Sequence, residues 1–325
     1  MKNESTETLD LSVIVPVYNE QDNLLKLYEE TIGAVDGKFA FEIIFIDDGS
    51  SDSSAQMLKE LQSKDDRVRV ILLRRNFGQT AAMSAGFDHA GGEIIVPLDG
   101  DGQNDPADIP KLIDKLNEGF DIVSGWRKDR KDKAVTRKIP SKIANWIIGK
   151  MTGIKLHDYG CSLKAYRSDV LKSIRLYGEM HRFIPALASW SGANITEMPV
   201  NHRPRTAGVA KYGLERIVKV VLDLMTVKFL GSYATKPIYI FGGLGILSGI
   251  GSTVSGLAVL YLKYISPQHL AMNRNPLLIL AAISFLATIQ FILMGLLAEM
   301  VVRTYHESQD RPIYFIKEII ESTDE

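Results

Sequence analysis

Two carboxylates separated by one glycine end an apolar run in the stretch VPLDGDGQND, residues 96–105. In an extended backbone, residues two positions apart point to the same side, so Asp99 and Asp101 can face one ligand together. The glycine that follows each of them allows the backbone and a ligand to come close. With the amide oxygen of Gln103, the carboxylates provide oxygen ligands for Mg²⁺ or Mn²⁺, which take further ligands from water and substrate phosphates.

Two other interpretations of this stretch have to be weighed. An EF-hand calcium loop needs Gly at its sixth position and Glu at its twelfth, where the chain has Asn104 and Pro110, so this interpretation fails. An aspartate-rich turn that caps a helix at DPADIPKL stays open, because a D-x-D by itself is a weak signal. The surrounding elements have to decide between a metal site and a turn.

The first half of the chain alternates apolar and amphipathic segments. Five apolar, β-branched runs predict strands, at residues 11–19, 41–50, 68–75, 92–101 and 120–126. Four segments with apolar residues at three- and four-residue spacing predict helices, at residues 20–35, 51–64, 79–90 and 105–118. This pattern indicates an α/β fold with a mainly parallel sheet covered by helices on both faces. Such a sheet gathers the carboxyl ends of its strands at one edge, where ligands bind.

A second carboxylate pair, Asp47 and Asp48, follows the second predicted strand in IDDGSSDSS. Either of the two can accept hydrogen bonds from a base or a ribose. The serines within 50–53 are expected to cap the next helix. The first strand is followed by VPVYNE, which excludes the usual G-x-G-x-x-G dinucleotide loop.

Two apolar segments near the C-terminus predict membrane spans. Residues 237–262 carry no charge, and residues 276–302 carry one, Glu299. Each exceeds the roughly 20 residues that cross a hydrocarbon core of about 30 Å. Their short connection predicts a hairpin, and a modest excess of Lys and Arg outside it places the large domain and both termini in the cytoplasm. Gly245 and Gly249 form a G-x-x-x-G that permits close packing, within the hairpin or between copies in a homo-oligomer.

An amphipathic segment precedes the hairpin. Apolar residues fall on one helical side of residues 213–235 and charged residues interrupt it, which predicts a juxtamembrane helix in the lipid interface, with a surface helix on the core as the alternative. The expected organisation is an α/β domain at 1–212, this helix, a hairpin within 236–303 and a cytoplasmic tail at 304–325.

The composition excludes some partners and chemistry. The formal net charge is −1, so no basic excess suggests nucleic acid as a partner. The single cysteine, Cys161, excludes an intrachain disulfide and is typical of a reducing compartment. A nucleophilic role for this cysteine is disfavoured, because the chain shows no clear histidine partner for it.

Four segments in order resemble the family-2 glycosyltransferases of the GT-A fold: SVIVPVYNE, IIFIDDGSSD, LRRNFGQTAAMSAG and VPLDGDGQNDP. The resemblance implies that the α/β domain is catalytic. It also implies that its first two segments line the nucleotide-sugar pocket, through Pro16, Tyr18, Glu20 and Asp48. The D-x-D segment would then hold the metal and the diphosphate, through Asp99, Asp101 and Gln103.

Segments in the later half of the chain point to one subgroup of this family. GWRKDR, RKIPSKIANWI, HDYGCSLKAYR and RPRTAGVAKYG, followed by a hairpin, look like the polyisoprenyl-phosphate glycosyltransferases, which include bactoprenol glucosyltransferases and dolichyl-phosphate mannose synthases. The resemblance places Arg127 near the donor sugar or the metal. It places four residues near the acceptor phosphate, namely Arg137, Ser141, Arg205 and Lys211. A serine is usual one residue before this lysine, and the chain has Ala210 there, so one hydroxyl contact is in doubt.

Asp158, in HDYGC, lies where related sugar-to-sugar transferases carry a base. It could act as a base, or it could orient the acceptor or an arginine. The catalytic residues expected from the resemblance are Asp101, Arg127 and Asp158. An acceptor phosphate is already ionised near neutral pH, because its second pKa is about 6, so cationic groups matter more than a strong base.

The resemblance thus implies an enzyme of the membrane that transfers a sugar, with inversion, from a nucleotide sugar to a polyprenyl phosphate. Glucose from UDP-glucose is the expected donor, and GDP-mannose or another UDP-sugar is the alternative. A processive polysaccharide synthase is disfavoured, because the chain lacks a Q-x-x-R-W segment and enough spans for a polymer channel. A membrane-anchored protein that binds nucleotide sugars without catalysis is the remaining alternative.

Overall fold

The computed structural model describes residues 9–128, 149, 153–174, 176, 180–204, 238–266, 275–308 and 313–321. The chain forms two compact units, one of Met1–Val227 with Pro312–Glu325 and the other of Lys228–Arg311. We call them the catalytic unit, after the activity that the resemblance implies, and the hairpin unit. The juxtamembrane helix predicted at 213–235 lies outside the described residues.

The catalytic unit contains one sheet of eight strands in the order β7-β5-β6-β4-β1-β2-β3-β8. Their bounds are β1 Leu11–Val17, β2 Phe41–Asp47, β3 Val68–Leu73, β4 Ile94–Pro97, β5 Ile122–Trp126, β6 Lys164–Arg167, β7 Ile195–Pro199 and β8 Ile316–Ile320. The pairs β1–β2, β1–β4, β2–β3 and β5–β7 are parallel. β6 runs antiparallel to β4 and β5, and β8 runs antiparallel to β3. The mainly parallel sheet predicted from the alternating pattern is confirmed.

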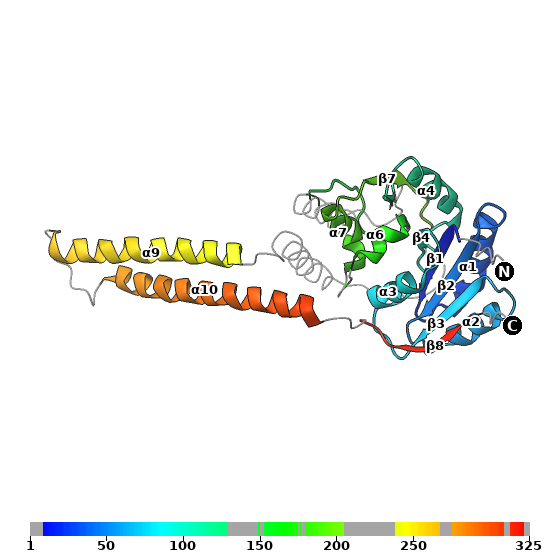
Figure 1. The fold of residues 1–325 in the computed structure, drawn as a ribbon, viewed down its shortest axis with the longest axis horizontal. Coiled ribbons are helices and arrows are strands. Elements are labelled where there is room, and N and C mark those ends of the chain that lie inside the picture. Colours follow the sequence, from blue (N-terminus) through cyan, green and yellow to red (C-terminus); the bar gives the residue numbers. More distant parts are fainter. Residues whose placement is uncertain are drawn as a thin grey trace, which may run out of the picture. The chain divides into compact units, whose positions relative to one another are not determined.

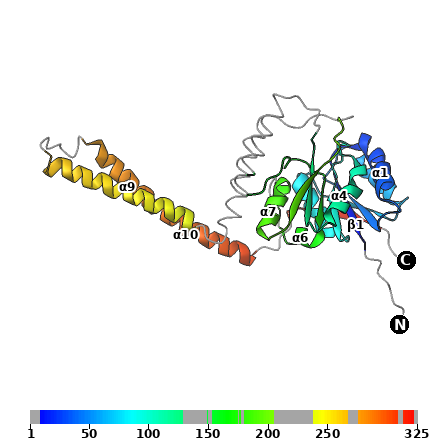
Figure 2. The same cartoon turned by 90° about the horizontal axis from the view of Figure 1, so that it is seen from above.

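Helices cover both faces of this sheet (Figure 1 and Figure 2). Their bounds are α1 Gln21–Val35, α2 Ser54–Gln62, α3 Gln79–His89, η1 Pro106–Asp108, α4 Ile109–Leu116, α6 Ser168–Lys172, η3 Met180–Phe183 and α7 Ile184–Trp190. Apolar residues of α1, α2 and α4 pack with alternate residues of β1 and β2, such as Val13 and Phe45, in the main core. On the other face, α3 approaches so closely that a Cβ at Gly86 would lie 2.3 Å from Ile14 Cγ2. Both faces of the central strands are therefore buried, which explains their continuous apolar runs.

The C-terminal segment adds a strand that the sequence did not predict. β8 pairs with β3, where Leu72 lies opposite Glu318, and the N–H of Arg74 donates to the carbonyl of Phe315 at 3.0 Å. Just before β8, the Tyr314 hydroxyl donates to Asp88 on α3 at 2.9 Å. In the tail predicted at 304–325, Ile316–Ile320 thus form an edge strand of the catalytic sheet, whereas residues 304–308 belong to the helix that ends at Ser308.

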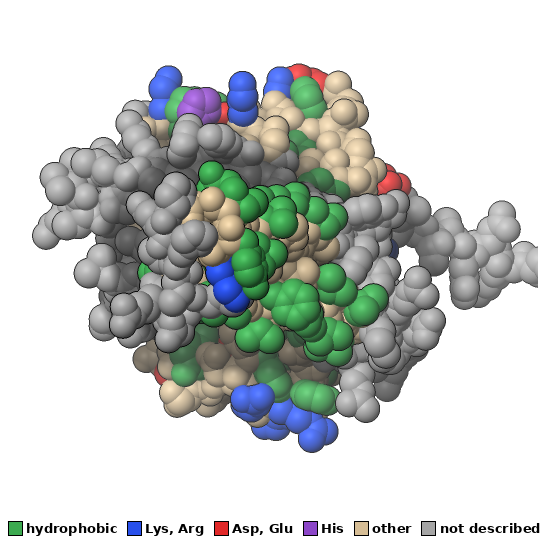
Figure 3. All heavy atoms as spheres, turned by 90° about the vertical axis from the view of Figure 1, so that its left-hand side faces the viewer, with side chains coloured by type: hydrophobic (Ala, Val, Ile, Leu, Met, Phe, Trp, Pro, Cys, Tyr) green, Lys and Arg blue, Asp and Glu red, His purple; other side chains and the backbone are tan. Residues whose placement is uncertain are grey.

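The hairpin unit consists of two long apolar helices, α9 (Ile238–Tyr264) and α10 (Pro276–Ser308). Phe241–Tyr264 and Pro276–Ala298 are long and apolar enough to cross a bilayer. These candidate spans agree with the prediction, although α10 continues six residues beyond the predicted end at 302. Large apolar side chains such as Ile246 and Leu286 are exposed along both helices. Figure 3, which faces the left-hand side of Figure 1, shows hydrophobic side chains gathered near the centre of that face.

The two helices pack through small residues. A Cβ at Gly245 would lie 3.2 Å from Ile292 Cγ1, and one at Gly249 would lie 3.6 Å from the Thr288 side chain. The Ser252 hydroxyl donates to the carbonyl of Ala281 at 2.9 Å. The G-x-x-x-G is therefore used for packing within the hairpin of one chain.

Candidate active site

The loops after β1 and β4 meet at the carboxyl edge of the sheet. A Cβ at Gly100 would lie 3.0 Å from the carbonyl oxygen of Pro16 and 3.7 Å from Glu20 Cγ. The missing side chain therefore lets the D-x-D loop lie directly against the loop after β1. This contact brings the residues predicted for the nucleotide and for the metal to the same edge.

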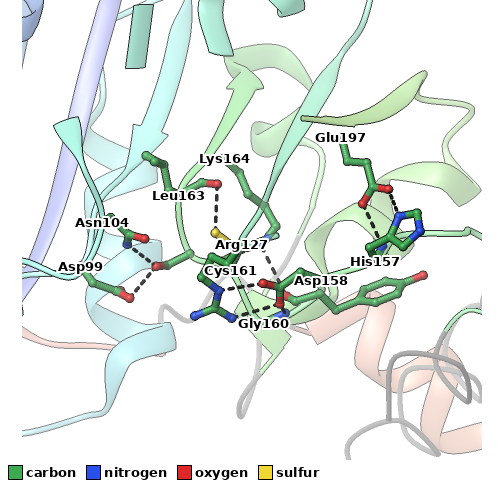
Figure 4. Close-up of polar contacts among 12 residues, drawn as sticks. Asp99, Asn104, Arg127, His157, Asp158, Gly160, Cys161, Leu163, Lys164 and Glu197 are labelled. Carbon is green, nitrogen blue, oxygen red and sulfur yellow. Dashed lines mark hydrogen bonds and ion pairs between the residues drawn. The ribbon is translucent and has the colours of Figure 1, made fainter. Parts of the chain in front are cut away.

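Asp99 is held by side chains from two other parts of the chain. Gln79 Nε2, at the start of α3, donates to its Oδ1 at 2.8 Å, and the Ser162 hydroxyl donates to its Oδ2 at 2.5 Å. Asn104 Nδ2 in turn donates to Ser162 Oγ at 2.8 Å, so the side chains of Asp99 and Asn104 converge (Figure 4). Burial and the nearby charge of Asp101 raise the pKa of Asp99, and its bond from Ser162 only partly offsets this. A divalent cation beside the two carboxylates would offset both effects.

The donor set at this edge fits Mg²⁺ or Mn²⁺. The described residues contain no group of three or more His, Cys, Asp or Glu side chains placed to hold a metal, so a cation at this loop would depend on Asp99 and Asp101 together with other oxygen ligands. Gln103 adds an amide oxygen on the same loop, and its N–H donates to Asp101 Oδ1 at 3.1 Å. Two carboxylates with additional oxygen ligands from phosphate and water are the usual set for Mg²⁺.

The next two aspartates have structural roles. Asp105 Oδ1 accepts the N–H of Ala107 at 3.1 Å and caps η1, so the turn interpretation is correct for this residue. Asn201 Nδ2 donates to Asp105 Oδ2 at 2.8 Å, and the N–H of Asn201 donates to Asp108 at 2.6 Å. Arg203 also pairs with Asp105 at 2.8 Å. Asn201 and Arg203, which follow β7, therefore hold the D-x-D loop in place. The sequence did not predict this role.

The predicted nucleotide residue Asp48 holds the loop between β3 and α3. Its two carboxylate oxygens accept the N–H groups of Phe77 and Gly78 at 2.7 and 2.9 Å. Burial raises the pKa of Asp48, and these two bonds reduce the rise. Asp48 therefore positions the loop that leads into Gln79.

The expectation that the serines within 50–53 cap α2 is wrong. Ser53 is the N-cap residue and its side chain makes no capping bond, whereas Asp52 accepts the N–H of Ser54 at 3.0 Å. Ser50 Oγ instead accepts the N–H of Asn19 at 2.9 Å, and Ser54 Oγ accepts that of Glu20 at 3.1 Å. The serines tie the loop after β2 to the loop after β1.

Arg127 and Asp158 form a bidentate ion pair beside the D-x-D loop (Figure 4). Arg127 Nε and Nη2 donate to the Asp158 oxygens at 2.7 and 3.0 Å, and the N–H of Gly160 donates to Asp158 at 3.1 Å. Burial works against the charge of Arg127, but the bond to Asp158 and the surrounding negative groups raise its pKa overall. Within the described residues, Nη1 of Arg127 makes no hydrogen bond and can donate to a ligand. The pair favours the orienting role for Asp158.

Three further residues complete the surroundings of this pair. Lys164 is buried and its Nζ donates to the carbonyl of Cys161, and burial lowers its pKa. Burial likewise raises the pKa of the Cys161 thiol, which agrees with a structural role for that residue. His157 stacks on the Trp126 ring and bonds to Glu197, so it too supports the structure. A lysine inside the otherwise apolar run LKAY was the one sequence signal that could have pointed to Lys164.

The four residues expected at the acceptor phosphate lie outside the described residues: Arg137, Ser141, Arg205 and Lys211. Their roles stay predictions. Among the other predicted residues, Pro16 lies near the end of β1 and Tyr18 and Glu20 follow that strand; all three are half-buried. The structure thus brings the predicted nucleotide and metal residues together with Arg127 and Asp158, and it adds Gln79 and Ser162.

Comparison with known proteins identifies the class to which this fold and edge belong. The model of the glycosyl transferase family 2 domain matches residues 12–175. The chain therefore belongs to glycosyl transferase family 2, and it is a glycosyltransferase.

Among curated proteins, the chain is 42% identical to the dodecaprenyl-phosphate galacturonate synthase of Rhizobium johnstonii, over 98% of this chain and 95% of that protein. It is 41% identical to the undecaprenyl-phosphate 4-deoxy-4-formamido-L-arabinose transferase of Salmonella paratyphi A, over 95% of this chain and 93% of that protein. These matches extend through the hairpin as well as the catalytic unit.

Among solved structures, the glucosyl-3-phosphoglycerate synthase of Mycobacterium tuberculosis in complex with Mn²⁺, UDP and phosphoglyceric acid has a TM-score of 0.53. The match has 16% identity and covers 69% of this chain and 78% of that chain. At this identity the likeness shows the fold alone, and it confirms the GT-A-type architecture.

Proposed function

We propose that the protein transfers a sugar from a nucleotide diphosphate sugar to the phosphate of a membrane polyprenol. The observation that carries the proposal is that one chain combines a D-x-D edge beside the Arg127–Asp158 pair with two apolar helices long enough to span a bilayer. Two relatives at 41–42% identity over nearly the whole chain carry names of this reaction class.

Several side chains would share the work of the reaction. Asp99 and Asp101, with Gln103, would hold Mg²⁺ or Mn²⁺, and the bound cation would supply Lewis-acid stabilisation of charge on the leaving phosphate. Gln79 and Ser162 hold Asp99 in place. These residues act by binding and orientation, because an ionised acceptor phosphate needs no strong base.

Arg127 would bind the donor near its sugar or diphosphate through the nitrogen that Asp158 does not engage. Arginine suits this role because its planar fork matches phosphate oxygens. Attack of the acceptor phosphate from the opposite side of the anomeric carbon would invert that centre. Pro16, Tyr18, Glu20 and Asp48 would form or support the nucleotide pocket, and the acceptor phosphate would meet Arg137, Ser141, Arg205 and Lys211.

The relatives' names do not support the expected donor sugar. They specify galacturonate and a formamido-arabinose, and neither is glucose. UDP-glucose therefore enters the assay as one donor among several, beside UDP-galacturonate, GDP-mannose and the UDP-linked formamido-arabinose.

We also propose that the hairpin crosses the membrane twice and leaves the catalytic unit and both termini in the cytoplasm. β3 precedes both helices and β8 follows them, yet the two strands pair in one sheet. Both must lie on the same side of the membrane, which requires an even number of crossings. The excess of Lys and Arg outside the hairpin supports the cytoplasmic side.

The test uses purified protein in detergent with undecaprenyl phosphate and each labelled donor, with Mg²⁺, with Mn²⁺ and with EDTA. We expect label in the organic phase from one donor, and its loss with EDTA and with Asp101→Ala. The matched control is Asp114→Ala, because Asp114 is an exposed aspartate of α4 away from the edge. Nucleotide binding without lipid-linked label from any donor would instead point to an untested donor or another acceptor.

A further inference from the structure

A row of hydrogen-bonded side chains leads away from the D-x-D loop to the turn before α7. Gln79, which donates to Asp99, is followed on α3 by Thr80, whose hydroxyl lies 2.7 Å from Nδ1 of His181. Arg182 Nε then donates to Nε2 of the same histidine at 3.3 Å. The row thus connects the carboxylate edge with an arginine on η3.

The direction of the bonds follows from the chemistry of the groups. A guanidinium nitrogen can only donate, so His181 Nε2 must be the unprotonated acceptor. The proton of the neutral ring therefore lies on Nδ1, which donates to Thr80 Oγ1. His181 and Thr80 are 7% and 2% exposed, so the ring is enclosed, and these two bonds help to orient it. The histidine thereby fixes the direction of the Arg182 side chain.

Arg182 differs from two other arginines near this edge, Arg127 and Arg203, in the partner that it has. Arg127 is paired with Asp158, and Arg203 is paired with Glu30 and Asp105. Half-buried Arg182 forms no ion pair with any carboxylate of the described residues, and its only hydrogen bond there is to neutral His181. Partly buried charges normally have a partner, so this guanidinium keeps two terminal nitrogens for an anion.

We propose that Arg182 binds a phosphate group of the reaction, with His181 and Thr80 as positioning residues. The inference rests on the proposed function, which supplies two sources of phosphate, the donor diphosphate and the acceptor monophosphate. Arg182 is linked through His181 to Thr80, which is adjacent in sequence to Gln79, and Gln79 donates to Asp99. The row of hydrogen bonds therefore places the Arg182 guanidinium beside the edge where the donor and acceptor phosphates must meet. The N-terminus of α3, where Thr80 lies, adds partial positive charge there.

The test compares Arg182→Gln and Arg182→Lys with a matched control, Arg167→Gln. Arg167 is also half-buried and bonds to a neutral group, Asn117, but it pairs with Ile94 at the opposite end of β4. We expect Arg182→Gln to raise the KM for one substrate about ten- to a hundredfold, the range for a lost charged hydrogen bond. Arg182→Lys should recover part of the loss, since it restores the charge without the fork, and Arg167→Gln should match the wild type.

Two measurements show whether Arg182 binds the acceptor phosphate or the donor diphosphate. If Arg182 binds the acceptor, the KM for undecaprenyl phosphate rises and the affinity for UDP, measured by calorimetry, stays at the wild-type value. If it binds the donor, the affinity for UDP falls. Unchanged values in both measurements, in Arg182→Gln protein with the wild-type unfolding temperature, would overturn the proposal.

His181→Phe tests the positioning role, because it removes the acceptor for Arg182 and keeps a ring of similar size. We expect it to change the same kinetic parameter as Arg182→Gln, and the double variant to lose no more than Arg182→Gln alone. If the losses of the two single variants add up in the double variant, His181 does not act through Arg182. If the wild type transfers no sugar at all, the proposed function fails, and direct binding of UDP and of undecaprenyl phosphate to Arg182→Gln still decides whether this arginine binds phosphate.

Discussion

At the scale of single residues, the hydrogen-bond partners of Asp158 distinguish between two roles that the sequence left open, a general base and a residue that orients Arg127. Both of its carboxylate oxygens accept hydrogen bonds from Arg127, and one also accepts the N–H of Gly160. A general base must direct a lone pair at the proton that it takes. The occupied oxygens therefore favour positioning of Arg127 over proton transfer.

We expect Asp158→Asn to lower kcat/KM about ten- to a hundredfold, because the charged hydrogen bonds to Arg127 contribute about 1.5–3 kcal/mol. The pH–rate profile should keep its shape, since no titrating base has been removed. Steady-state kinetics across pH, on protein with the wild-type unfolding temperature, measure both effects, with Asp114→Asn as the control. Loss of the acidic limb of the profile would show that Asp158 is a base.

A second expectation concerns Gln79, which donates to Asp99. Gln79→Leu removes one of the two bonds that orient this carboxylate, so the concentration of Mn²⁺ that gives half-maximal activity should rise about tenfold, in the range for groups that orient metal ligands. Activity measured against Mn²⁺ concentration checks this. Gln56→Leu, on the exposed side of α2, should behave as the wild type, and an equal shift in both variants would refute the role of Gln79.

The residues differ in how readily the sequence revealed them. Asp99 and Asp101 were predictable because their spacing is local and their strand is marked by an apolar run. Gln79 and Ser162 were not, because their roles arise from bonds to Asp99 across 20 and 63 positions of the chain. Local sequence patterns do not predict such long-range contacts, which form only when the sheet assembles.

At the scale of elements, β8 connects the C-terminal segment to the loops of the nucleotide edge. The Phe315 ring lies 6.0 Å from that of Phe77, whose N–H donates to Asp48, and Tyr314 bonds to Asp88 on α3. The strand thus supports the loop and the helix that position Gln79.

We expect a chain that ends after residue 312 to bind UDP less tightly than the wild type, and to unfold a few degrees lower. Loss of β8 and of the residues just before it leaves the edge of β3 unpaired and removes the contacts to Phe77 and Asp88. Calorimetry with UDP and thermal unfolding in detergent measure the two effects. A chain that ends after Glu321 keeps β8 and should match the wild type; UDP affinity that is the same in all three proteins would contradict a role for β8 at the edge.

The central strands and the helices between them were predictable, because strands buried on both faces give continuous apolar runs. β8 was not predictable in this way. Its residues Ile316–Ile320 are half-buried or exposed on an edge, and they follow a long apolar helix that dominates the surrounding pattern. Only the pairing with β3 identifies them as a strand.

At the scale of the whole molecule, the hairpin uses its small residues within one chain. We expect Gly245→Leu to force α9 away from α10, since even a Cβ there would lie 3.2 Å from Ile292. The protein should unfold at a lower temperature in detergent and lose transfer to undecaprenyl phosphate. Gly256→Leu is the control, because no atom lies within 4 Å of a Cβ at that position. Equal unfolding temperatures in the two variants would argue against packing through Gly245.

The pairing of β8 with β3 also sets an order for biosynthesis. Arg74 and Ile316, which meet at this pairing, are 242 residues apart, so a ribosome that adds about 5–20 residues per second needs about 10–50 s to pass from one to the other. Throughout this interval the edge of β3 is an open template for pairing with other chains. Both apolar helices emerge before the missing strand does, so the catalytic sheet is completed only after these helices have left the ribosome.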